Sequence, residues 1–81
     1  MQSSFPPIDA VKALDQRIFA TLTPDEMNVL NFYRDQGRKH GVTIIIDTDA
    51  NPDDLARASS RERADQILKQ ANNLVHVTVA D

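Results

Sequence analysis

Four aspartates and an asparagine crowd the segment that follows the most apolar stretch of the chain. Ile44–Ile46 run directly into Asp47, Asp49, Asn51, Asp53 and Asp54. Carboxylate and amide oxygens are the ligands that hard divalent cations such as Ca²⁺ and Mg²⁺ prefer. The four aspartates are therefore a candidate site for Ca²⁺ or Mg²⁺ and, through the ion, for a ligand or a nucleotide.

The segment Ile44–Ala58, IIIDTDANPDDLARA, resembles the first strand and loop of nucleoside hydrolases, whose pattern is an apolar run followed by D-T-D-P-G-x-D-D-A. Carried across by position, the resemblance implies Ca²⁺ ligation by three of the aspartates, Asp49, Asp53 and Asp54. Residues 50–52 replace the P-G-x turn of that family, and a chain of 81 residues has no room for the later strands that complete its site. We therefore do not assign the chain to that family.

The same residues also suit the start of a helix. Asn51 can cap a helix, Pro52 fits the first helical position, and carboxylates in the first turn interact favourably with the helix dipole. Each contribution of this kind is worth about 0.3–2 kcal/mol. A helix start needs no ion, and it leaves Asp47 and Asp49 as the two aspartates that it does not require.

A second candidate is the basic end of a predicted helix, formed by Arg34, Arg38, Lys39 and His40. Clustered cations contact phosphates, so nucleic-acid or phosphate binding is an alternative function. Cations at the C-terminal end of a helix also interact favourably with its dipole and need no ligand. Because the net charge is −3, the chain has no overall attraction to nucleic acid, and only a local patch would support such binding.

No arrangement of residue types points to a catalytic centre. The chain has no cysteine, only two histidines, His40 and His76, and no serine in a nucleophile motif. We therefore predict no catalytic residue and no cofactor beyond Ca²⁺ or Mg²⁺. The leading hypothesis is a small non-enzymatic interaction or regulatory protein that binds other proteins, with the cation site and nucleic-acid contact as alternatives.

The spacing of apolar residues predicts the elements that position these candidates. Steps of three and four residues predict a helix over 8–22. The capping box Thr23–Glu26 begins a second helix at Pro24, which ends at Gly41 or, if the polar end unwinds, at Gly37. These two helices are predicted to form a hairpin, because the turn between them is short.

Two strands and a third helix complete the prediction. Val42–Asp47 is rich in β-branched residues, and Leu74–Ala80 alternates valines with polar residues. A helix over 52–72 separates them, with a break near Ser59 where a new helix can start. A strand, a helix and a strand predict a parallel pair, so the fold class is α/β, with α+β as the alternative: a helical hairpin packed on a two-stranded sheet.

The small size of the chain favours a partner. At 81 residues it is one domain, residues 8–81, preceded by a flexible arm at 1–7, and its stability margin is thin. A two-stranded sheet leaves strand edges unpaired, so we predict either a homodimer that extends the sheet, with the last strand as the seam, or a helical hairpin that covers the sheet. The sequence has no membrane-spanning apolar run and no signal-peptide pattern, so we predict a cytoplasmic location.

Overall fold

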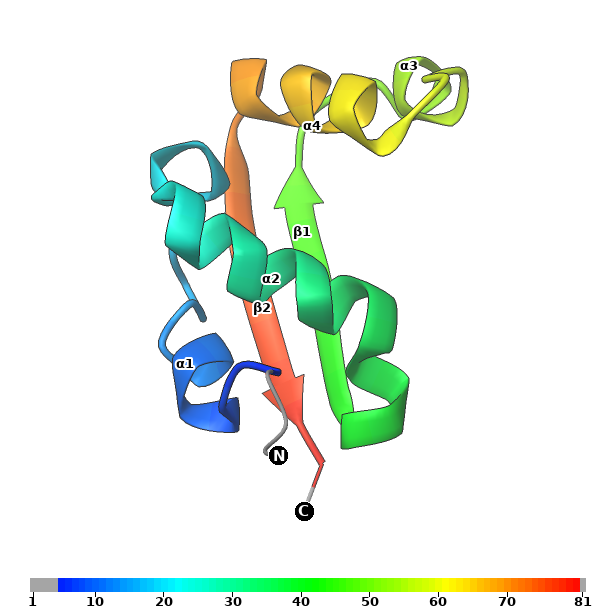
Figure 1. Ribbon diagram of the computed structural model, residues 1–81. Helices are drawn as coiled ribbons and strands as arrows, with labels where there is room; N and C mark the ends of the chain where they lie inside the picture. The colour runs from blue at the N-terminus through cyan, green and yellow to red at the C-terminus, as the bar shows by residue number, and fades with distance from the viewer. Residues whose placement is uncertain (1–4, 81) are drawn as a thin grey trace.

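The structure is a computed structural model that describes residues 5–80. Its elements are α1 (Ile8–Lys12), η1 (Phe19–Thr21), α2 (Pro24–Gln36), η2 (Gly37–His40), β1 (Val42–Thr48), α3 (Pro52–Ala56), α4 (Arg61–Gln70) and β2 (Asn73–Val79). α1 and α2 cover one face of the two-stranded sheet, while α3 and α4 lie across one end of it (Figure 1). The predicted class, a mixed helix-and-strand domain consistent with α/β, is confirmed.

The two strands run antiparallel, so the predicted parallel pairing is wrong. Thr48 at the end of β1 pairs with Asn73 at the start of β2. The helix predicted over 52–72 is broken, as expected near Ser59: α3 ends early, and the Ser60 hydroxyl caps α4. Because no single long helix runs back along the sheet, the connection folds over its end and delivers β2 beside β1 in the opposite direction (Figure 1).

The helix predicted over 8–22 is wrong beyond Lys12, where α1 ends. The chain then turns, and Gln16 takes a left-handed conformation with φ of 69°. In that conformation the Gln16 N–H donates to the Val75 carbonyl at 2.7 Å, and the Val75 N–H donates to the Arg17 carbonyl at 2.8 Å. The unwound segment therefore pairs with β2, and the predicted hairpin is reduced to the short α1 packed against α2.

The start of α2 is the predicted capping box. The Thr23 hydroxyl accepts a hydrogen bond from the Glu26 N–H at 3.2 Å, and the Glu26 carboxylate accepts one from the Thr23 N–H at 2.8 Å. Arg17 also donates to Glu26, at 2.8 Å. The Arg17 guanidinium, together with the Thr23 N–H, lowers the pKa of the Glu26 carboxyl below its usual value. Glu26 thereby ties the start of α2 to the segment that pairs with β2.

Glycines decide how α2 ends. The α-helix stops before Gly37, as one of the two predicted endings has it, and η2 continues to Gly41, whose φ is 69°. A Cβ atom on Gly37 would lie 2.5 Å from the Val42 carbonyl oxygen. Only glycine permits that approach, which brings the end of α2 against the start of β1.

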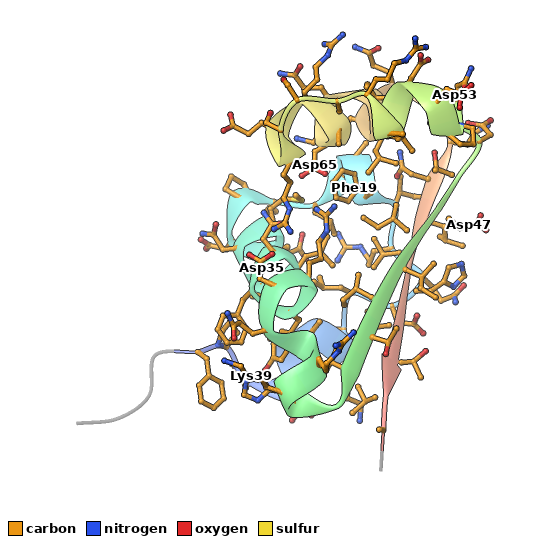
Figure 2. All side chains as sticks on the ribbon, turned by 90° about the vertical axis from the view of Figure 1, so that its right-hand side faces the viewer. Phe19, Asp35, Lys39, Asp47, Asp53 and Asp65 are labelled. Carbon is orange, nitrogen blue, oxygen red and sulfur yellow. The ribbon has the colours of Figure 1, made fainter. Side chains whose placement is uncertain are left out.

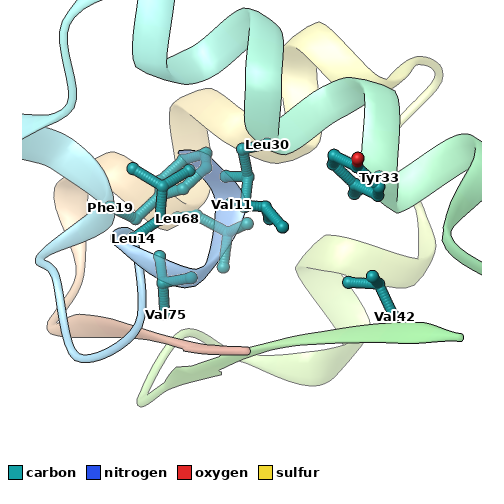
Figure 3. Packing of buried hydrophobic residues seen from close by; sticks show 8 residues of the cluster. All are labelled: Val11, Leu14, Phe19, Leu30, Tyr33, Val42, Leu68 and Val75. Atoms are coloured by element: carbon teal, nitrogen blue, oxygen red, sulfur yellow. The ribbon is translucent and has the colours of Figure 1, made fainter. Parts of the chain in front are cut away.

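The core lies between the helices and the inner face of the sheet (Figure 3). Because side chains alternate along a strand, the even-numbered residues of β1 face this core and the odd-numbered residues face solvent. The buried apolar side chains are Val11, Leu14, Phe19, Leu30, Tyr33, Val42, Leu68 and Val75. Burial of such side chains is the main favourable contribution to folding, about 1.5–3 kcal/mol for each large one.

Part of the predicted N-terminal arm packs against α2. The Phe5 ring stacks on Phe32 with centroids 5.9 Å apart and lies 4.9 Å from the ring of His40. The Tyr33 hydroxyl donates to the Pro6 carbonyl. Residues 1–4 of the arm lie outside the described residues.

Candidate functional site

Asp49 is hydrogen-bonded to Asn72 across the base of the α3–α4 connection. Its carboxylate accepts from the Asn72 backbone N–H at 3.0 Å and from the Asn72 side-chain amide at 2.7 Å. The Asp49 N–H lies 3.4 Å from the Asn72 carbonyl oxygen. We call this pair the Asp49–Asn72 clasp. It closes the connection next to the Thr48–Asn73 pair. Asp49 therefore has a structural role, although the start of the following helix does not require it.

The other predicted metal ligands point to separate places. Asp53 and Asp54 lie in the first turn of α3, where the Asn51 side chain caps the helix by accepting from the Asp53 N–H at 2.8 Å. Asp47 lies on the outer face of the sheet, 3.8 Å from the His76 ring (Figure 2). Within residues 5–80, no group of three His, Asp or Glu side chains is arranged to hold a metal ion.

The predicted basic segment is also divided. Arg34 donates to both carboxylate oxygens of Asp65 at 3.2 Å, and the Asp65 residue is only 8% exposed. His40 packs among the aromatic rings of α2 and Phe5. Arg38 and Lys39 are exposed on η2. The four residues therefore do not present one continuous surface to a phosphate backbone.

The outer edge of β2 is closed. Gln16 and Arg17 take both backbone groups of Val75, and the Asp15 carboxylate accepts from the Val77 N–H at 2.9 Å. An edge strand whose polar groups are already paired is a poor template for another strand. We call the outer edge of β2 at Val75 and Val77 the closed edge.

The outer edge of β1 is open. Val75 and Val77 turn their backbone groups away from β1, so the residues opposite them, Ile46 and Ile44, must turn theirs away from β2. Among residues 5–80, no group outside the sheet hydrogen-bonds to the N–H or C=O of Ile44 or Ile46. We call this stretch the open edge, and it faces the viewer in Figure 2.

A groove of about 530 Å³ runs beside the open edge, between the sheet, the end of α2 and the start of α4. The residues that line it include Tyr33, Arg34, Arg38, Val42, Ile44 and Arg61. We call it the basic groove.

Two of the guanidinium groups in the basic groove are already paired. Arg34 is bonded to Asp65, and Arg61 forms an ion pair with Asp35. The Arg61 hydrogen bond lowers the pKa of the Asp35 carboxyl. Within the described residues the Arg38 side chain has no ion-pair or hydrogen-bond partner, so it is the guanidinium that a ligand can engage.

Asn73 is a structural residue that the sequence analysis missed. Its side-chain amide donates to the Leu68 carbonyl at 2.9 Å and to the Ala71 carbonyl at 2.8 Å, and its side-chain oxygen accepts from the Ala20 N–H at 3.2 Å. It is 7% exposed. A polar residue in the core-facing register of an alternating strand was the signal that could have identified it.

No protein-family model, no curated protein and no solved structure matches this chain. None of the helices formed by residues 5–80 is long and apolar enough to cross a membrane. The fold and its surfaces define a small mixed helix-and-strand domain with one closed and one open sheet edge.

Proposed function

We propose that this chain acts by binding another protein along the open edge of β1. The observation that carries the proposal is the pair of residues Ile44 and Ile46, whose backbone N–H and C=O groups have no partner outside the sheet within residues 5–80. An unpaired edge is a template for an added strand, and main-chain hydrogen bonds supply the affinity of such complexes. Asn51 caps α3, Asp49 forms the clasp with Asn72 and Arg34 pairs with Asp65, whereas the guanidinium of Arg38 is available to a ligand.

The test is a nuclear magnetic resonance titration with a capped peptide of alternating valine and threonine. The largest shifts are expected at the amides of Ile44 and Ile46, because these groups gain hydrogen bonds. Ile44→Pro removes the outward N–H without removing a bond to β2, so it should abolish binding. Ile44→Ala is the matched control: it also shortens the side chain but keeps the N–H, and it should still bind.

Two results would contradict the proposed function. One is the absence of shifts at Ile44 and Ile46 when the peptide is in excess. The other is equal binding by folded Ile44→Pro and Ile44→Ala, which would show that the outward N–H is not used.

Self-association is one form of this proposal. A homodimer is predicted from the sequence, and the open edge favours such pairing along β1 rather than along the last strand, whose outer edge is occupied at Val75 and at the Val77 N–H. Sedimentation at tens of micromolar tests it. A monomer would contradict the homodimer and leave binding to a different protein untouched.

A further inference from the structure

We infer that the segment bound at the open edge is an extended peptide whose side chains facing α2 are acidic. This inference rests on the proposed function and names the chemistry of its partner. It is carried by the basic groove beside the open edge and by the free guanidinium of Arg38.

The alternation of a strand determines which side chains enter the groove. Successive side chains of an added strand point to opposite faces of the sheet. Those on the inner face lie beneath the end of α2, next to Tyr33 and Arg38. Those on the outer face lie beside Ile45, which is 58% exposed. The groove therefore favours a partner that alternates inward polar residues with outward apolar ones.

The charge of the basic groove determines which kind of polar side chain it favours on the bound segment. Asp65 and Asp35 already neutralise the other two guanidinium groups of the groove, whereas Arg38 is unpaired among the described residues. A carboxylate beside Arg38 would form charge-assisted hydrogen bonds, which are stronger than neutral ones. A cationic side chain at the same place would meet like charge. Because the whole chain carries −3, the attraction is local rather than long-range.

A second copy suits this groove less well. An antiparallel pair that sets Ile44 opposite Ile46 of the copy has its twofold axis at Ile45, directly beside the groove-lining residues Val42 and Ile44. The two basic grooves would then meet at the axis with charges of the same sign. Nucleic acid also suits the site less well, because its backbone does not offer the alternating donors and acceptors that the open edge requires.

The test uses two capped peptides, one alternating valine with glutamate and one alternating valine with lysine, titrated into the full chain. Shifts of the Ile44 and Ile46 amides report binding, and the glutamate peptide is expected to bind at least about tenfold more tightly. Arg38→Gln should remove most of that preference. Lys39→Gln is the matched control, because it deletes a neighbouring exposed cation that does not line the groove, and it should keep the preference.

Failure of the inference can be told apart from failure of the proposed function. Equal binding of both peptides, or equal effects of Arg38→Gln and Lys39→Gln, would overturn the acidic preference and leave strand addition standing. Concentration-dependent shifts without peptide would identify a second copy as the occupant, and shifts caused by a single-stranded oligonucleotide would identify nucleic acid. Either would overturn the inference. No shift with either peptide or with the valine–threonine peptide would remove strand addition itself.

Discussion

The two outer edges of the sheet differ in whether their backbone groups have hydrogen-bond partners. On β2, the turn at Gln16 brings a piece of main chain alongside the strand and bonds both backbone groups of Val75, and the Asp15 carboxylate accepts from the Val77 N–H. On β1, no group outside the sheet within residues 5–80 bonds to the backbone of Ile44 or Ile46. A two-stranded sheet is only marginally stable on its own. An unpaired edge beside a groove therefore calls for a functional explanation.

The largest expected effect comes from breaking the closed edge. Gln16→Pro removes the N–H that bonds to Val75 and cannot adopt the positive φ of this residue, so it should lower the free energy of unfolding by about 3 kcal/mol or more. Gln16→Gly accepts that backbone conformation and should change stability by less than about 1 kcal/mol. Urea unfolding measures both. Equal losses in the two variants would contradict the role given to the left-handed turn.

The next effect concerns the anchor where the closed edge begins. Asn73→Ala leaves the Ala20 N–H and two carbonyls without their buried partner, and it should cost about 2–3 kcal/mol. Asn72→Ala at the neighbouring exposed position removes only a side-chain bond to Asp49 and should cost about 1 kcal/mol or less. Urea unfolding of the pair provides the comparison. Equal losses of stability in Asn73→Ala and Asn72→Ala would contradict the role given to the buried hydrogen bonds of Asn73.

A smaller effect tests whether Asp49 is a clasp or a metal ligand. Asp49→Ala removes the bonds to Asn72 and should cost about 1 kcal/mol, with or without millimolar Ca²⁺. Asp49→Asn keeps an acceptor for the Asn72 N–H and should lose less. Thermal melts measure these differences. A rise in the melting temperature of the unchanged chain with Ca²⁺, absent in Asp49→Ala, would instead support the predicted cation site.

The smallest effect is a pH dependence at Glu26, whose salt bridge to Arg17 supports the closed edge. Because the pKa of Glu26 is lowered in the folded chain, its stabilising contribution is present above the usual carboxyl range and is lost as pH falls through the folded pKa. Glu26→Gln should therefore lower stability near pH 7 and lower it less near pH 3. Urea unfolding at both values checks this. A penalty that grows toward acid would contradict the sign.

Local signals in the sequence predicted much of the fold. The capping box at Thr23, the Asn51 cap and the two strands depend on near neighbours, and all are present. The turn at Gln16 and the antiparallel pairing were not predicted, because sheet bonds to a residue far along the chain compete with helical periodicity there.

The same limit applied to the candidate site. The role of Asp49 depends on Asn72, which the segment IIIDTDANPDD does not contain. The open edge, likewise, can only be recognised once the direction of β2 and the position of Gln16 are known.

Amide hydrogen exchange of the dilute chain tests the difference between the two edges most directly. The amides of Ile44 and Ile46 should exchange at least about tenfold faster than those of Val75 and Val77, and should slow when the valine–glutamate peptide is added. If Ile44 and Ile46 are instead as protected as Val75 in the dilute chain without peptide, the edge of β1 is not open, and the proposed function loses its basis.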